Sequence, residues 1–192
     1  MNSIQLIAGL GNPGAQYTGT RHNVGAWCLD MLTQVANCRL KAESQFHGLH
    51  AIVTLWGQEC HLLCPTTYMN ESGLSVRAVA KYYKIPSESI LILHDDIDLP
   101  PGVVRLKFDG GTGGHNGLED IIDHLHTKKF HRLRFGVGHP GHGNDVVRYV
   151  LDVPSVSERT LIQEAIQHAQ ESFPEILSGN FSKAMQKLHQ KS

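Results

Sequence analysis

Short apolar segments alternate with amphipathic segments along most of this chain. Strands are predicted over residues 3–9 and over the segments "HGLHAIVTLW", "CHLLCP", "SILILHDDI", "VVRLKF" and "HRLRFGVG". Helices are predicted over residues 23–36, from the loop "TTYMNESG" to about residue 84, near 117–126, and from about Ser155 to the end with a break near Gly179. An alternation of strands and helices is typical of a layered α/β domain.

Two of the predicted strands lie close together, on either side of Gly57 and Gln58. This spacing is typical of a β-hairpin, so the sheet is expected to be mixed and not purely parallel. A chain of 192 residues is long enough for one well-buried core, and no repeat or low-complexity linker divides it. We therefore predict a single α/β domain over residues 1–192, with a mixed, twisted β-sheet flanked by helices.

Polar residues gather in four loops that each follow a predicted strand: "GLGNPGAQYTGTRHN", "PTTYMNES", "HDDIDLPPG" and "DGGTGGHNG". The carboxyl ends of strands in open α/β sheets tend to face one crevice, so these side chains are expected to meet there. The set comprises Asn12, Tyr17, His22, Asn23, Tyr68, Asn70, Asp95, Asp96, His115 and Asn116.

The first loop carries Gly9, Gly11 and Gly14, which fit the G-x-G-x-x-G pattern of dinucleotide-binding proteins. That pattern also requires a helix that begins at the loop, since the pyrophosphate binds to free N–H groups there. Pro13 removes one of those groups, and the loop continues for several more polar residues. No acidic residue follows a second strand at the expected distance, because Asp30 lies in a helical pattern. A dinucleotide site is therefore disfavoured.

The residue types in the four loops suit hydrolysis by an activated water. A His held by an Asp makes a general base near neutral pH, and Asn side chains supply neutral N–H donors to a developing oxyanion. No G-x-S-x-G motif is present, and neither Ser72 nor any cysteine has a local signature of a nucleophile. Each residue also has a structural alternative: Asn70 and Asn116 suit helix N-caps, and a buried His is more often a core or capping residue.

A metal site is a further alternative. The ligand types are present in His22, His94, Asp95, Asp96 and His115. However, His94 and Asp95 should point to opposite faces of a strand, and no H-x-x-x-H pair supports a metal. Hydrolysis without a metal is favoured.

Charge is balanced overall and uneven along the chain. The net charge of −1 gives no general basic field for nucleic acid. Six basic residues nevertheless fall between positions 105 and 134, and they form either one basic surface or part of a mixed solvated face. They are Arg105, Lys107, Lys128, Lys129, Arg132 and Arg134.

The remaining composition points to an ordinary cytoplasmic protein. The start "MNSIQLIAGL" lacks the basic region and cleavage site of a signal peptide, and no apolar run has the length of a membrane span. The cysteines lack C-x-x-C spacing, which favours reduced, buried thiols over zinc or disulfides. They are Cys28, Cys38, Cys60 and Cys64.

Five motifs together resemble the bacterial type of peptidyl-tRNA hydrolase. They are "GLGNPG…YTGTRHNVG", "PTTYMNESG", "HDDIDLPPG", "GGTGGHNGL" and "FHRLRFGVGHPG", in this order, and the resemblance extends from about Ile4 to the last helix. It implies a monomeric enzyme without a cofactor, which cleaves the ester between a peptide and the 3′ end of tRNA. It also implies that the first glycine loop presents Asn12 to this ester.

The resemblance assigns a role to each matching residue. His22 is the base that activates water, Asp95 orients it, and Asn12 stabilises the developing charge together with Asn70. Asn116 holds the peptide backbone, while Tyr17, Tyr68, Met69 and His115 line the same crevice. Lys107 and Arg134 match a basic pair that binds the terminal 5′ phosphate of tRNA.

The chain departs from the family pattern in the residues expected to contact tRNA. Gly143 and Glu119 stand where basic residues are frequent, and Thr112 replaces a frequent His. Two alternatives therefore stay open: an RNA-binding module without hydrolysis, and an amidase or esterase for small N-acylated compounds. An intact His22 and Asp95 pair argues against the first, and the basic cluster argues against the second.

Overall fold

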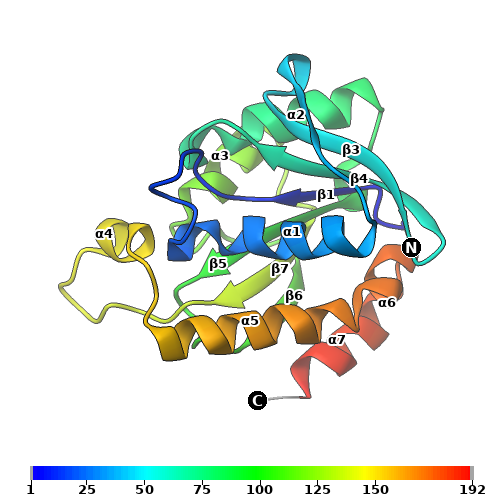
Figure 1. Cartoon of the computed structure of the whole chain (residues 1–192). Helices are drawn as coiled ribbons and strands as arrows, with labels where there is room; N and C mark the ends of the chain where they lie inside the picture. Colours follow the sequence, from blue (N-terminus) through cyan, green and yellow to red (C-terminus); the bar gives the residue numbers. More distant parts are fainter. Residues whose placement is uncertain (1, 191–192) are drawn as a thin grey trace.

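The computed structural model describes residues 2–190, in which a seven-stranded sheet lies between two layers of helices (Figure 1). The strand order is β2-β3-β4-β1-β5-β7-β6. The pairs β4–β1, β1–β5 and β5–β7 are parallel and the other three are antiparallel, so the predicted mixed sheet is confirmed. The strands are β1 (Leu6–Gly9), β2 (Lys41–Glu43), β3 (Gly48–Leu55), β4 (Gln58–Pro65), β5 (Ile90–Asp96), β6 (Val104–Phe108) and β7 (His131–Gly136).

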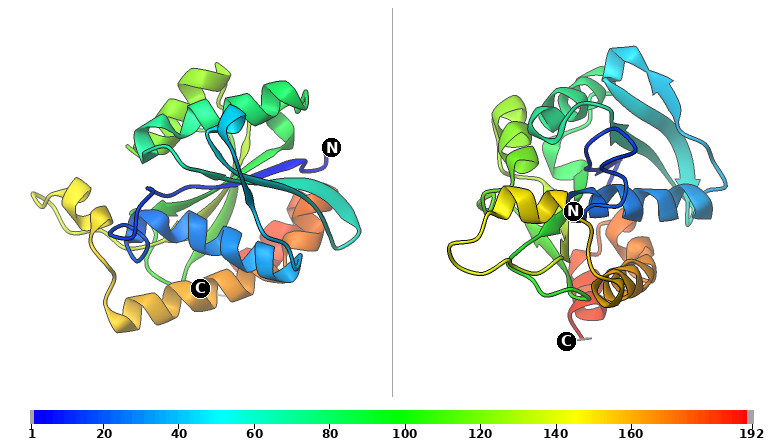
Figure 2. Two further views of the ribbon diagram at one scale, coloured as in Figure 1. Left: turned by 45° about the horizontal axis from the view of Figure 1, so that its top comes forward. Right: turned by 60° about the vertical axis from the view of Figure 1, so that its left-hand side comes forward.

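Helices cover both faces of the sheet, with α2 and α3 on one face and α1 and α5 on the other (Figure 2). The predicted single α/β domain is therefore confirmed. No helix among the described residues combines the length and apolar character that a bilayer span requires. The helices are α1 (Val24–Val35), α2 (Ser72–Tyr82), α3 (Asn116–Leu125), α4 (Val146–Leu151), α5 (Val156–Gln170), α6 (Phe173–Ser178) and α7 (Phe181–His189).

The central strands β1 and β5 are buried on both faces, which explains their continuous apolar sequence. The hairpin predicted between β3 and β4 is also present. Its turn is Trp56 and Gly57, because Leu55 already pairs with Gln58. Both turn residues have positive φ angles of 46° and 79°, as a two-residue hairpin loop requires. Trp56 tolerates this conformation while its ring stacks on Phe173, with 6.1 Å between the ring centroids.

The loop "DGGTGGHNG" reaches the crevice by a different route from the predicted one. It follows β6, but β6 is antiparallel to β7, and Phe108 at its end pairs with His131, the first residue of β7. The carboxyl ends of β6 and β5 therefore point in opposite directions, away from one another along the strands. Residues 109–115 return along the sheet, and Arg132 holds this return by donating to the carbonyls of Gly110 (2.9 Å) and Gly111 (2.5 Å).

Strand β2 and helix α4 were not predicted. Both are short, with three and six residues, so neither has enough periods of a hydrophobic pattern to stand out. A capping signal marks α4 in retrospect: Asp145 precedes it and accepts from the backbone N–H of Arg148.

We expect Gly25→Ala to destabilise the fold by about 1–3 kcal/mol or more, because a Cβ at Gly25 would overlap the backbone of Leu93 and Leu10. Urea unfolding measures the change. Gly111→Ala is the matched control, since a Cβ there meets nothing within 4 Å, and its effect should stay within about 0.5 kcal/mol. Equal effects of the two substitutions would contradict the close packing of α1 on β1 and β5.

Candidate active site

A crevice of about 310 Å³ opens at the carboxyl ends of β1, β4 and β5. Segments distant in sequence meet there: the loops after these strands, the start of α3, and α4. All the residues predicted for catalysis and substrate binding line this crevice. They are Asn12, Tyr17, His22, Tyr68, Met69, Asn70, Asp95, His115 and Asn116.

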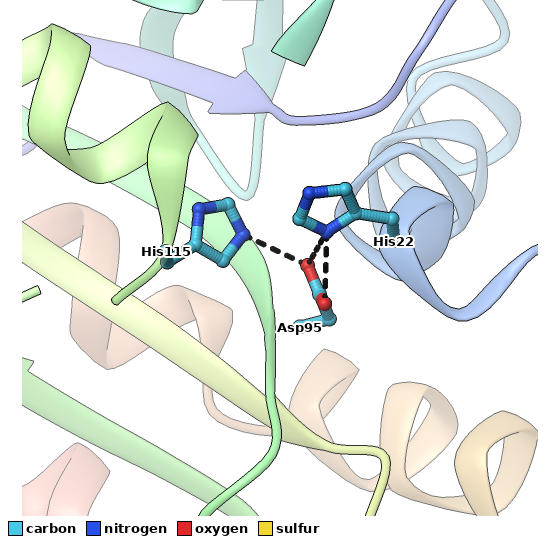
Figure 3. Close-up of side chains that lie close together, drawn as sticks. All are labelled: His22, Asp95 and His115. Carbon is cyan, nitrogen blue, oxygen red and sulfur yellow. Dashed lines mark hydrogen bonds and ion pairs between the residues drawn. The ribbon is translucent and has the colours of Figure 1, made fainter. Parts of the chain in front are cut away.

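The carboxylate of Asp95 is the centre of the crevice floor. Its side chain is only 2% exposed, and it accepts hydrogen bonds from two imidazoles (Figure 3). Nδ1 of His22 lies 2.9 and 3.0 Å from its two oxygens, and Nε2 of His115 lies 2.8 Å from Oδ1. Because a carboxylate can only accept, both ring nitrogens must donate to it.

The two histidines are held in different ways. His115 is the N-cap of α3, and its Nδ1 accepts from the backbone N–H groups of Gly117 and Leu118 at 3.2 and 3.4 Å. Both nitrogens of His115 are thus engaged, and Asn116, which suited the cap by sequence, is instead the first residue of the helix. On His22 only Nδ1 has a hydrogen-bond partner among residues 2–190, so its Nε2 keeps a lone pair that can take a proton.

The environment favours an ionised Asp95 and a basic His22. Burial opposes the protonated form of His22, but the charge of Asp95 and its hydrogen bond outweigh burial and raise the pKa of His22 above 6.5. Burial alone would raise the pKa of Asp95, yet the two neighbouring imidazoles hold it well below its usual range. His22 therefore has the electrostatic setting of a general base.

Asn12 is fixed by its neighbours in an orientation suited to donation. Its Oδ1 accepts from the backbone N–H of Met69 at 2.7 Å, which leaves the Nδ2 amide group as its free end. Asn23 holds the Asn12 backbone by two reciprocal bonds of 2.9 and 3.0 Å. A Cβ at Gly11 would lie 2.9 Å from the Asn23 amide, so this clamp requires glycine there.

Lys107 and Arg134 lie in a second cavity of about 170 Å³, which shares His94, Asp96, Thr112 and Gly113 with the crevice. Lys107, Arg132 and Arg134 line this cavity, and cations stand opposite one another on the strands beneath it: in the register of β6 and β7, Lys107 lies opposite Arg132 and Arg105 lies opposite Arg134. Like charges directly opposite on neighbouring strands repel, so this arrangement is suited to an anion. Asp96 binds Nε of Arg134 at 2.8 Å, and the two Nη groups have no hydrogen-bond partner in the part of the chain that the structure describes, so they can bind another group.

Three of the five residues considered as metal ligands come together. The ligand atoms of His22, Asp95 and His115 lie within 4.8 Å of one another. A metal there would have to replace the hydrogen bonds that organise the cluster. His94 donates from Nδ1 to the backbone oxygen of Asp95 at 2.7 Å, and Asp96 pairs with Arg134, so neither belongs to the group.

Sequence reasoning missed one wall of the crevice. Apolar side chains of α4 form it, and they are Val146, Val147, Val150 and Leu151. Asn23 was among the polar residues expected in the crevice, but the sequence did not predict that it would hold the backbone of Asn12.

Comparisons with known proteins agree on one family. Residues 6–192 match the family model described as "Peptidyl-tRNA hydrolase". The chain is 51% identical over 186 residues to the peptidyl-tRNA hydrolase of Nitrosospira multiformis, covering 97% of each chain. It is 46% identical to that of a Marinomonas species, covering 98% of each. The crystal structure of peptidyl-tRNA hydrolase from Acinetobacter baumannii superimposes with a TM-score of 0.93 at 45% identity, over 96% of this chain and 94% of that one.

We expect His22 to titrate above pH 6.5 in NMR measurements of its ring, because Asp95 stabilises the protonated form. In Asp95→Asn, burial remains while the charge is lost, so the pKa of His22 should fall below 6.5. Asp98→Asn, which removes an exposed carboxylate that does not touch His22, should leave this pKa unchanged. A wild-type value below 6.5 would contradict the assigned pairing.

Proposed function

This chain belongs to the peptidyl-tRNA hydrolase family and is a hydrolase of that class, and we propose that it cleaves the ester between a peptide and the 3′ end of tRNA by a water that His22 deprotonates. The observation that carries this proposal is the free Nε2 of His22 in a ring held by a buried carboxylate. The reaction releases free tRNA and peptide, without a covalent intermediate.

The first step is attack by water. Nε2 of His22 takes a proton from the water as its oxygen bonds to the ester carbonyl carbon, and Asp95 stabilises the imidazolium that forms. His115 acts as a positioning residue, because both of its nitrogens are occupied in holding Asp95 and the first turn of α3. A general base of this kind contributes about 10²- to 10⁴-fold to the rate.

The second step is collapse of the tetrahedral intermediate. The free amide group of Asn12 donates to the oxyanion, and Asn70, from the loop after β4, provides a second donor. The bond to the 3′ oxygen of tRNA then breaks, and the imidazolium of His22 returns its proton to that oxygen. One water is consumed, and the base ends in its starting form. No metal ion or organic cofactor takes part in the proposed steps.

The peptide and the tRNA are proposed to bind on different sides of this centre. Tyr17, Tyr68, Met69 and the apolar wall of α4 suit the peptide, while Asn116 suits its backbone groups. Lys107 and Arg134 suit a tRNA phosphate, because they are cations on the floor of a separate cavity. This division favours peptidyl-tRNA over a small N-acylated ester, which would have no use for the second cavity.

Replacement of His22 by Asn should lower kcat for peptidyl-tRNA by about 10²- to 10⁴-fold or more, with an unchanged melting temperature. Single-turnover hydrolysis of N-acetylaminoacyl-tRNA measures the rate. His47→Asn is the matched control: His47 is exposed, has a φ of 49° that Asn tolerates, and lies outside the crevice. If His22→Asn kept more than about a tenth of the wild-type rate, His22 would not be the base.

Lys107→Ala should raise KM for full-length peptidyl-tRNA and reduce the salt slope of binding by about 0.7 to 0.9, because one phosphate contact is lost. Hydrolysis of a short 3′-terminal fragment that carries the same peptide should change little. Lys41→Ala, on the strand at the other edge of the sheet, is the control. Equal impairment of tRNA and fragment by Lys107→Ala would show that Lys107 does not bind a distant phosphate.

A further inference from the structure

Arg21 comes directly before His22, the proposed base, in the sequence. It has no part in the proposed steps, yet it is buried, with only 7% of its surface exposed. Its Nη1 donates to the carbonyls of Tyr149 (3.1 Å) and Asp152 (3.4 Å), and its Nη2 pairs with Glu158 at 3.0 Å. The guanidinium also lies 3.9 Å from the centre of the Tyr149 ring. These partners all belong to α4, its C-cap and the first turn of α5.

Helix α4 depends on such external contacts, because six residues do not form a stable helix alone. Its two sides are tied to different parts of the fold. Arg21 holds its last turn to the loop that carries His22, and the backbone N–H of Arg21 adds a bond of 3.1 Å to the carbonyl of Asp152. The hydroxyl of Tyr149 donates to the carbonyl of Val137, just after β7, at 2.8 Å.

Arg21 and its partner Glu158 carry opposite charges. Burial alone would raise the pKa of Glu158, but hydrogen bonds from Ser155 and the charge of Arg21 lower it, so the pair stays ionised. The same carboxylate oxygen accepts from the backbone N–H of Ser155 at 2.7 Å and completes the capping box of α5. One guanidinium thus fixes the junction of α4 and α5 to the catalytic loop.

We propose that Arg21 is a positioning residue that sets the distance between the apolar wall of α4 and the reacting centre. Val150 and Leu151 of this wall follow Tyr149 directly, and they line the crevice, whereas no residue of α4 lines the second cavity. The wall therefore faces the peptide and not the tRNA. Arg21 acts on peptide binding through α4, while His22 keeps its own contacts to Asp95. The inference rests on the proposed function, since it takes a peptidyl ester as substrate.

The test compares two substrates on the same tRNA, one carrying N-acetylglycine and the other N-acetylated trileucine. In Arg21→Gln, kcat/KM for the trileucine substrate should fall by about 10- to 100-fold, mainly through KM, because the wall is displaced. For the glycine substrate, which has no side chain to place against the wall, the fall should stay below about threefold. Arg21→Lys, which keeps the charge but not the forked geometry, should recover part of the loss.

Arg159→Gln is the matched control, because Arg159 is exposed on α5 next to Glu158 and contacts the Trp27 ring and not α4. It should leave both substrates unaffected. Hydrogen exchange of residues 146–152 should quicken in Arg21→Gln and not in Arg159→Gln. If Arg21→Gln does not fold, Glu158→Gln serves instead, since it removes the charge and keeps an oxygen acceptor. We then expect a smaller loss of activity that is again larger for the trileucine substrate than for the glycine substrate.

Equal losses for the two substrates, or no loss, would overturn the proposal for Arg21. Failure of the wild-type enzyme to hydrolyse either substrate would instead overturn the proposed function. The two failures are distinguishable because the first is read from a ratio between substrates and the second from the wild-type rate.

Discussion

A single buried negative charge organises the functional end of this molecule. The carboxylate of Asp95 lies at the end of a strand that is buried on both faces, where an unpaired charge would be very costly. His22 and His115 compensate it, and they come from segments almost a hundred residues apart. These hydrogen bonds therefore draw the loop after β1 and the start of α3 together over β5. The contacts that offset the cost of burying this charge use only Nδ1 of His22, so its Nε2 stays free.

Successive residues of β5 serve different sides of the sheet. Asp95 meets the two imidazoles, while the next residue, Asp96, pairs with Arg134 in the cationic cavity. The residue before, His94, is neutral: burial, together with the neighbouring His115, lowers its pKa to about 3. A neutral ring between the two sites adds no charge to either of them. The alternation of a β-strand thus separates the proposed ester chemistry from the proposed phosphate binding by one residue.

Most of the fold was predictable because its strands and helices are long enough to show a period. The prediction failed where the structure depends on pairing that a hydrophobic pattern does not encode. The direction of β6 decides the route of the glycine loop, and only the pairing of Phe108 with His131 reveals it. Similarly, Asn116 and His115 both suit a helix start, and the choice between them depends on a carboxylate twenty residues away in sequence. Helix α4 was missed because six residues show too few periods of a hydrophobic pattern, and its contacts to Arg21 and Val137 join segments that are distant in sequence.

The glycines of the first loop have a structural purpose that accounts for their likeness to a dinucleotide-binding pattern. In both cases a helix packs closely against the strand before it, and side chains at the crossing would prevent this. Here a Cβ at Gly9 would lie 2.6 Å from the carbonyl of Gly25, and one at Gly11 would displace Asn23. The turn is therefore closed by the Asn23 amide, which occupies the Asn12 backbone groups that an open loop would offer to a pyrophosphate. Because this closure fixes Asn12 and the residues around His22 in one rigid turn, the loop is suited to hold a donor and a base at a set distance and not to bind a nucleotide.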